Sequence, residues 1–381
     1  MSNAAIGARQ SVDPDPSAPP GSPTGPSRGR RSSWRLARGF GVDRFSGLYV
    51  AILLIVVFSL LDPVRFGTLN NFRIIAASQA ITGILVLGLI ISLLSGVFDI
   101  SIAANMTLAI SFVGWLQASG LNAGLAVLIT LCVGAAVGAT NAAIILFLKV
   151  DPVIATLGTS SILAALTYWI AQGNTIVDGI SPTFAEFGRY RILTIPAPVF
   201  YFLGIALILW YVLEHTPAGR YMYAIGSNAE AARLSGLKVR RLQWIALISS
   251  GVLGAFAGVV LTMQLGAASY GAGAPYLLTA FAVAFLGSTQ VRPGRFNVGG
   301  TIVALYLLAI GVKGLELQYP SLPWIKDLFV GAALIVAVAI GARAALRRAN
   351  PAAGRRSRRR AASGDDGASA VAEQPLVEPK P

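Results

Sequence analysis

HTPAGRYMYAIGSNAEAARLSGLKVRR, residues 215–241, is a polar, turn-rich and basic stretch in the middle of an otherwise apolar chain. The runs on either side of it, residues 196–213 and 244–265, are apolar and long enough for helices in lipid. Within the stretch, Ser227 and Glu230 have the spacing of a capping box. Gly236 is placed to end a helix in the left-handed conformation. We therefore expect a short helix over residues 228–235, outside the membrane and packed against other protein because so short a helix is not stable alone.

Composition places the chain among integral membrane proteins. Of its 381 residues, 55% are hydrophobic and 12% are charged, whereas an average soluble domain has about 25% charged residues. We expect an all-α, polytopic membrane protein with about ten transmembrane helices. These helices are predicted over residues 47–61, 74–97, 102–116, 125–148, 153–171, 196–213, 244–265, 276–288, 297–315 and 324–345. The segment 276–288 is short for a full crossing, so an extension through residues 271–275 and a re-entrant segment both stay open.

The two ends of the chain differ from this apolar body. Residues 1–45 and 346–381 are polar and low in apolar residues, so we expect both to be disordered tails around a transmembrane domain of residues 46–345. Residues 1–46 and 342–381 hold 16 of the 30 Lys and Arg residues, and the positive-inside rule explains them more simply than nucleic-acid binding does. The rule places both termini and the loop 215–242 in the cytoplasm.

The residue inventory argues against several kinds of chemistry. No Gly-x-x-x-x-Gly-Lys-Ser/Thr motif is present, so the chain is not expected to hydrolyse a nucleotide itself. The single cysteine, Cys132, and the single histidine, His215, leave no intrachain disulfide and no cysteine- or histidine-rich metal site. We expect no catalytic residue, bound cofactor or bound metal in this chain.

Asp99 is the most notable ionisable residue in the apolar body, because a carboxylate at the bilayer centre costs about 2.5–3.5 kcal/mol on insertion scales. Either it caps the third helix at a break, or it contacts a solute. The polar residues that are candidates for a substrate pathway are Asp99, Asn105, Asn141, Thr156, Thr159 and Gln264. Helix packing explains most such residues as well, because amides bond across helix interfaces where small residues such as Gly138 and Gly254 allow close approach.

Four stretches resemble the motifs of one known family. GVFDIS (96–101) resembles the family's G-x-x-D-L-S-x-G, and DPVIATLGT (151–159) resembles its P-F-I-A-T-L-G-T. YAIGSNAEAARLSG (223–236) resembles its Y-A-I-G-G-N-x-x-A-A-x-x-S-G, and FLGST (285–289) with a later Gly294 resembles its G-G-T-S followed by a glycine. The chain thus resembles the permease subunit of bacterial ribose-type ABC importers, over about residues 45–345. Leu286 replaces one glycine of the last motif, and no glycine follows GVFDIS at the family's position.

This resemblance implies a transport subunit without its own ATPase site, in the bacterial inner membrane. It would form the pathway for a monosaccharide such as ribose, or for a similar small polar solute. The implied partners are a second copy in a homodimer, an ABC subunit that hydrolyses ATP with Mg²⁺, and an extracytoplasmic solute-binding protein. The helix 228–235 would be the coupling helix, and the implied ATPase-coupling residues are Ser227, Asn228, Glu230, Ala231, Ala232, Arg233 and Gly236.

Two other classes of protein are weighed against this one. An ion-coupled secondary transporter of a small polar solute would need charged groups inside the bundle, for which Asp99 alone gives thin support. An intramembrane enzyme or a structural membrane protein is disfavoured because the spans hold no nucleophile–base pair. Dependence of uptake on ATP rather than on an ion gradient separates the importer from the secondary transporter.

Overall fold

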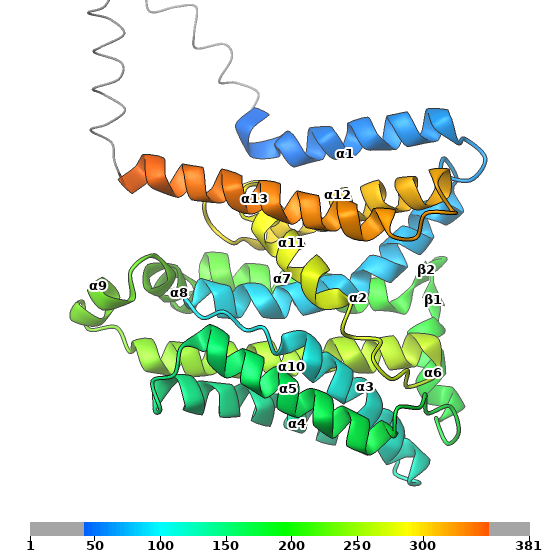
Figure 1. Cartoon of the computed structure of the whole chain (residues 1–381), viewed down its shortest axis with the longest axis horizontal. Coiled ribbons are helices and arrows are strands. Elements are labelled where there is room, and N and C mark those ends of the chain that lie inside the picture. The colour runs from blue at the N-terminus through cyan, green and yellow to red at the C-terminus, as the bar shows by residue number, and fades with distance from the viewer. Residues whose placement is uncertain (1–41, 350–381) are drawn as a thin grey trace, which may run out of the picture. The chain divides into compact units, whose positions relative to one another are not determined.

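A computed structural model describes residues 42–349, and the side chains of residues 46–340. The described chain is helical with one two-stranded sheet, as the all-α prediction requires (Figure 1). Its elements are α1 (Val42–Leu61), α2 (Leu69–Leu94), α3 (Ile102–Ala118), α4 (Ala123–Leu146), α5 (Pro152–Ala171), α6 (Pro182–Arg189), β1 (Arg191–Ile192), β2 (Ile195–Pro196), α7 (Ala197–His215), α8 (Pro217–Ser227), α9 (Ala229–Leu234), α10 (Val239–Leu265), α11 (Tyr276–Gly287), α12 (Val298–Gln318) and α13 (Ile325–Ala349).

The long helices follow the predicted spans closely. Six of them in the described part of the chain, α2, α4, α5, α7, α10 and α12, are long and apolar enough to cross a membrane. The residues Ser46–Leu61 of α1, together with α3 and α11, are apolar but shorter. The chain is thus a multi-pass membrane protein, and the full number of ten crossings stays a prediction. The predicted disordered tails lie outside the described residues, apart from residues 42–45 and 346–349, which belong to α1 and α13.

Polar side chains define where several helices begin. In each case a side-chain oxygen accepts a hydrogen bond from a backbone N–H of the first turn, which would otherwise have no partner. The capping residues are Thr68 before α2, Asn122 before α4, Asp151 before α5 and Asn297 before α12. These caps place the turns at the ends of the apolar runs, which is why the sequence pattern predicts the spans well.

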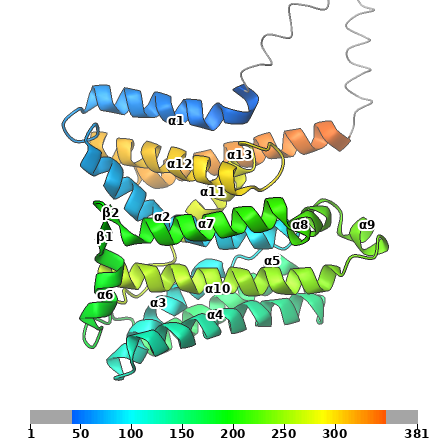
Figure 2. The same cartoon turned by 180° about the vertical axis from the view of Figure 1, so that it is seen from behind.

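α2 lies at the centre of the bundle. Every residue from Ala80 to Ser95 is buried, and α10, α7, α12 and α11 all contact this helix. A helix that is covered on every side is expected to be apolar on every side, and this half of α2 is apolar apart from Thr82 and Ser92. Figure 2 shows α2 behind α7, with α10 on one side and α12 on the other.

α4 and α10 pack so closely that their backbones touch. A Cβ atom added to Gly251 would overlap the carbonyl oxygen of Gly134, and one added to Gly138 would overlap the carbonyl oxygen of Leu247. Only glycine allows this approach. Gly138, which the sequence predicts as a packing position, therefore acts as one at this crossing, whereas Gly254 packs against Ile102 of α3.

Two irregular segments interrupt the bundle. Residues 95–101 leave α2 at the end of the bundle where α8 and α9 lie, and return among the helices to α3 (Figure 1). Residues 266–275 leave α10 at the opposite end, near α6 and the β1–β2 hairpin, and return to α11. The rings of Phe98 and Phe285 stack with centroids 6.3 Å apart. Residues 266–287 thus run from one end of the bundle to the other, as an irregular stretch followed by the short helix α11, which agrees with the extension through residues 271–275 and not with a re-entrant segment.

Candidate functional site

The polar stretch between α7 and α10 folds into the two short helices α8 and α9. α9 begins after Asn228, whose side-chain oxygen accepts a 2.9 Å hydrogen bond from the backbone N–H of Ala231. A helix within residues 228–235 is therefore confirmed, but the predicted capping box is wrong. The Ser227 hydroxyl donates to the carbonyl oxygen of Ala224 instead, because Ser227 is still the last residue of α8.

Glu230 does not return to the backbone of Ser227, as a capping box requires. Its carboxylate pairs with the Arg233 guanidinium at 2.6 Å, one turn further along α9. This hydrogen bond raises the pKa of Arg233 above its ordinary value. The side chains of Arg233 and Glu230 are 68% and 65% exposed, and so exposed a pair contributes little to stability. Both groups are therefore free to contact another protein.

The rest of α9 is anchored on one face and open on the other. Ala232 is buried, whereas Leu234 is 79% exposed. Gly236 closes the helix with φ +84°, the left-handed conformation predicted for it. The result is a short helix that presents an ion pair and a large apolar side chain to the outside.

α8 connects this helix to the bundle through three contacts. The Tyr223 hydroxyl donates a 2.9 Å hydrogen bond to the carbonyl oxygen of Phe296, and burial raises the pKa of this hydroxyl, which keeps it protonated. The Arg295 guanidinium lies over the Tyr223 ring. Gly226 packs so closely on the last turn of α2 that a Cβ there would come within 2.5 Å of the Leu94 carbonyl oxygen. A displacement of α8 must therefore act on α2 and on residues 288–297.

A fourth contact joins the end of α7 to the same segment. Glu214 forms an ion pair with Arg292, and the Glu214 side chain is 15% exposed. Arg292 and Phe296 both belong to the connection between α11 and α12, so the Glu214 pair and the Tyr223 hydrogen bond hold the same segment. Residues 288–297 are thus held from two directions by the 214–227 region.

Asp99 lies at the centre of a buried polar cluster. Its carboxylate accepts hydrogen bonds from the Ser101 hydroxyl at 2.7 Å, the Ser101 backbone N–H at 3.1 Å and the Ser250 hydroxyl at 2.7 Å. The Asn141 amide donates to the Ser101 hydroxyl at 2.7 Å. Asp99 is 2% exposed. The cluster connects the break after α2 to α4 and α10, so Asp99 binds the segment that leads into α3 as well as a neighbouring helix.

The other predicted pathway residues do not gather in one place. The Asn105 amide donates to the Gly251 carbonyl oxygen at 2.7 Å, beside the Asp99 cluster. The hydroxyls of Thr156 and Thr159 donate to carbonyl oxygens of their own helix, α5. Gln264 lies at the far end of α10, where its carbonyl oxygen accepts from Arg189. None of the six lines the cavity between α2, α11, α12 and α13.

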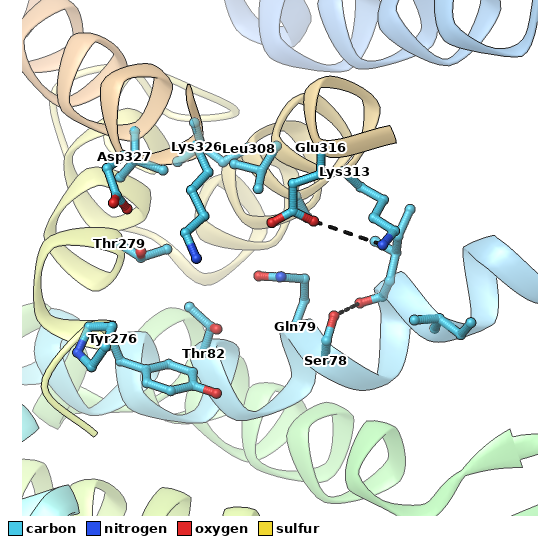
Figure 3. A pocket seen from close by; sticks show the side chains of 16 residues that line it. Ser78, Gln79, Thr82, Tyr276, Thr279, Leu308, Lys313, Glu316, Lys326 and Asp327 are labelled. Carbon is cyan, nitrogen blue, oxygen red and sulfur yellow. Dashed lines mark hydrogen bonds and ion pairs between the residues drawn. The ribbon is translucent and has the colours of Figure 1, made fainter. Parts of the chain in front are cut away.

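A cavity of about 460 Å³ opens instead between α2, α11, α12 and α13 (Figure 3). Its polar lining is Ser78, Gln79, Thr82, Tyr276, Thr279, Lys313, Glu316, Lys326 and Asp327. Sequence reasoning did not select this set for the pathway. A signal was nevertheless present, because Lys313 and Glu316 place an i, i+3 charged pair at the end of an apolar span.

The described part of the chain is thus a bundle of apolar helices with two irregular segments among them, a cavity between four of the helices and an exposed short helix at one end. These features are typical of a membrane transport protein. Residues 71–338 match the family model described as the permease component of the branched-chain amino acid transport system. The chain belongs to this family of ABC importer permeases.

Curated relatives agree with this assignment. The ribose import permease protein RbsC of Bacillus subtilis is 35% identical over 274 residues, which cover 72% of this chain and 84% of the relative. The D-allose transport system permease protein AlsC of Escherichia coli is 30% identical over 299 residues, 78% of this chain and 91% of the relative. The autoinducer 2 import system permease protein LsrD of Photorhabdus laumondii is 29% identical, over 75% of this chain and 87% of its own. No solved structure matches the chain.

Proposed function

We propose that this chain forms the membrane pathway of an ATP-driven importer for a monosaccharide or a similar small polar solute, and that α9 is its coupling helix. The relatives that are named for ribose and allose import support the class of solute. ATP and Mg²⁺ are bound and used by a separate ABC subunit. What this chain contributes is the pathway and the surface on which that subunit acts.

The exposed helix α9 is the observation that carries the proposal. Asn228 caps it, Ala232 anchors it and Gly236 closes it, so six residues are held in a helix that would not be stable alone. Its outward face carries the Glu230–Arg233 pair and the exposed Leu234. A mixed charged and apolar surface of this kind suits a docking site, where buried apolar contact gives affinity and charge gives orientation.

The contacts of α8 supply a mechanical route from α9 to the pathway. A push on α9 passes to α8, since only Asn228 separates the two helices. Through Tyr223 and Phe296 it reaches residues 288–297, and through Gly226 it reaches Leu94 at the end of α2. These two segments are continuous with α11 and α2, and both helices line the cavity. Nucleotide-driven motion of the partner would in this way change the cavity.

The distribution of basic residues supports an inward-facing α8–α9 end. The connections at this end are residues 147–151, 214–241 and 288–297 (Figure 1). They contain eight Lys and Arg residues: Lys149, Arg220, Arg233, Lys238, Arg240, Arg241, Arg292 and Arg295. α1 begins and α13 ends toward this end as well, and the sequence before α1 and after α13 is rich in Arg. By the positive-inside rule this end, with both termini, faces the cytoplasm of a bacterial inner membrane.

The proposal also includes two further partners. A second copy of the chain would complete the pathway as a homodimer. An extracytoplasmic solute-binding protein would dock at the opposite end, where residues 172–196 and the 319–324 turn lie. No nucleic acid partner is proposed.

Purification from the native host in a mild detergent tests the coupling role. A P-loop ATPase is expected to co-purify with the full chain in stoichiometric amount. Glu230→Arg reverses the charge on the docking face and breaks the pair with Arg233, and it should reduce the recovered ATPase by about tenfold, the effect of about 1.4 kcal/mol. Glu186→Arg is the matched control, because Glu186 is also exposed on a short helix, α6, but at the opposite end.

The two outcomes have distinct meanings. Loss of the ATPase in Glu230→Arg, with normal amounts of the variant in the membrane and no loss in Glu186→Arg, supports the importer. A chain that purifies alone and transports solute in vesicles without ATP would show an ion-coupled transporter instead. Asp99 would then be the residue to change first, since Asp99→Asn should abolish ion-coupled uptake.

A further inference from the structure

The cavity between α2, α11, α12 and α13 continues toward the outer end of the bundle. A second cavity of about 260 Å³ adjoins it and shares Glu316 and Lys326 with it. The second cavity is otherwise lined by Tyr319, Pro320, Leu322 and Pro323, which belong to the turn between α12 and α13. The two cavities together connect the proposed outer surface with the interior of the bundle.

The floor of the larger cavity lies half-way along α2. Thr82 is 13 residues from Leu69, the first residue of this helix of 26 residues, which is about 20 Å at a rise of 1.5 Å per residue. Thr82 is only 3% exposed, whereas Lys326 and Asp327 at the mouth are exposed. The cavity therefore reaches from the outer end to about the middle of the membrane.

Two threonine hydroxyls in this cavity differ from the others in the bundle. Threonines in helices commonly donate to the carbonyl oxygen four residues earlier. In the described chain eight of them do so: Thr107, Thr130, Thr140, Thr156, Thr159, Thr167, Thr262 and Thr301. The structure records no such bond for Thr82 or Thr279, and both line the cavity.

Gln79 and Tyr276 line the same space, and their polar atoms also have no recorded hydrogen bond within the described residues. In Figure 3 the Gln79 amide and the Lys326 ammonium both point into the open centre. Thr82 is buried, and Gln79, Tyr276 and Thr279 are half-buried. Because the structure records no bond from another protein group to these four side chains, all four are available to a molecule that enters the cavity.

The charged residues at the mouth indicate what kind of molecule this is. Lys313 and Glu316 form an ion pair at 3.8 Å, and Lys326 and Asp327 follow on α13. Two ammonium groups and two carboxylates give the lining no net charge, so neither an anion nor a cation is favoured. Hydroxyl, amide and carboxylate groups in a concave site suit a neutral solute that both donates and accepts hydrogen bonds.

We infer that this cavity is a solute-binding site, in which Thr82, Thr279 and Gln79 hold a neutral polyhydroxylated molecule of monosaccharide size below the Glu316 carboxylate. The inference rests on the proposed function, and it places the site within a single copy of the chain. Tyr276 supplies an aromatic ring at the start of α11, next to the irregular segment 266–275. The site is occupied from the outer side, before the solute passes further along α2.

Cysteine accessibility tests the site directly. Cys132 is the single native cysteine, it is exposed on α4 and it is replaced by serine first. Thr279→Cys is then treated in intact cells with a membrane-impermeant methanethiosulfonate reagent, with and without millimolar D-ribose, D-allose or leucine. Leu278→Cys is the control, because Leu278 is exposed on the same helix but does not line the cavity.

We expect Thr279→Cys to be modified from outside and to be protected by a neutral sugar, with the rate lowered about tenfold at a sugar concentration near ten times its Kd. Leucine should not protect it, and Leu278→Cys should show no sugar dependence. No modification of Thr279→Cys, an unchanged rate with every sugar, or protection by leucine alone would each overturn the inference.

Transport kinetics separate this inference from the proposed function. Thr82→Val keeps the shape of the side chain but removes the free hydroxyl, so the KM for uptake should rise about fivefold with an unchanged maximal rate, as for loss of one hydrogen bond in binding. Thr130→Val, which removes a hydroxyl bonded within α4, should leave the KM unchanged. If uptake depends on ATP and the KM is equal in Thr82→Val and Thr130→Val, the inferred site is wrong but the proposed function stands. Uptake without ATP would overturn the proposed function.

Discussion

The Ser250 hydroxyl donates a 2.7 Å hydrogen bond to the Asp99 carboxylate and so attaches the break after α2 to the middle of α10. Asp99 accepts two further bonds from Ser101 at the start of α3. Within the described residues its partners are hydroxyl and amide groups, and no basic side chain pairs with it. A carboxylate held in this way positions the segment that it belongs to.

The bond between Ser250 and Asp99 gives a stability prediction. Ser250→Ala leaves a carboxylate oxygen buried without this donor, which should lower the free energy of unfolding by about 1–3 kcal/mol. The control is Ser111→Ala, because the Ser111 hydroxyl is buried without a hydrogen-bond partner and its loss should be neutral or stabilising. Thermal unfolding of the purified variants in detergent measures both. Equal midpoints for the two variants would mean that the bond contributes nothing.

The crossing of α4 and α10 should tolerate no side chain at Gly251. A methyl group there meets the Gly134 carbonyl oxygen, so Gly251→Ala must separate the helices, at a cost of about 1–3 kcal/mol or more. Gly204→Ala on α7 is the matched control, since a Cβ at Gly204 meets nothing within 4 Å. The amount of folded protein in detergent, measured by fluorescence-detected gel filtration, should fall for Gly251→Ala only.

Loss of the capping residue Asn228 should destabilise α9 more than loss of the Ser227 hydroxyl. Asn228→Ala removes the bond to the Ala231 N–H and should destabilise α9 by about 1 kcal/mol, the usual cost of losing an N-cap. Ser227→Ala removes only a bond within α8. Hydrogen exchange of residues 229–235 should accelerate in Asn228→Ala and stay as in the parent chain in Ser227→Ala. The reverse result would restore the capping box that the sequence predicts.

Loss of the hydrogen bond from Tyr223 to Phe296 should weaken the coupling between ATP hydrolysis and uptake, and it should not impair folding. Tyr223→Phe keeps the ring beside Arg295 but loses a hydrogen bond of about 0.5–1.5 kcal/mol. We expect uptake per ATP hydrolysed to fall by about twofold to tenfold while the chain remains in the membrane in normal amount. Tyr221→Phe is the control, because Tyr221 is exposed two residues earlier on the same helix. A normal ratio in Tyr223→Phe would exclude this route.

Much of the helical framework follows from local sequence. Thr68, Asn122, Asp151 and Asn297 mark helix starts, and the apolar runs between them predict the spans. The same local signals mislead by one residue at α9. Ser227 and Asn228 are both good capping residues, and the choice between them depends on where α8 ends. That end is set by the packing of Gly226 on Leu94, a contact across 132 positions of sequence.

The cavity could not be predicted in the same way. Gln79 is visible in the sequence as a polar residue in an apolar run, but nothing local connects it with Thr279 or Lys326. The three residues meet only because α11 starts inside the bundle after the irregular segment 266–275. Conversely, Thr156 and Thr159 look suitable for a pathway, yet their hydroxyls are already bonded within α5. Sequence shows which groups are polar, and the structure shows which of them still need a partner.

The burial of α2 beyond Thr82 has a consequence for the cycle of transport. From Ile84 to Leu94 every residue of this helix is buried, and these residues cover about 15 Å at the helical rise. The cavity between α2, α11, α12 and α13 therefore ends on a buried segment of α2 that is about as long as half the thickness of the membrane core. If the inferred site holds the solute, this structure corresponds to a loading state, and release of the solute would require the lower half of α2 to part from its neighbours. Leu94, against which Gly226 of α8 packs, lies at the end of this buried segment, where the proposed nucleotide-driven partner would act on it through α8.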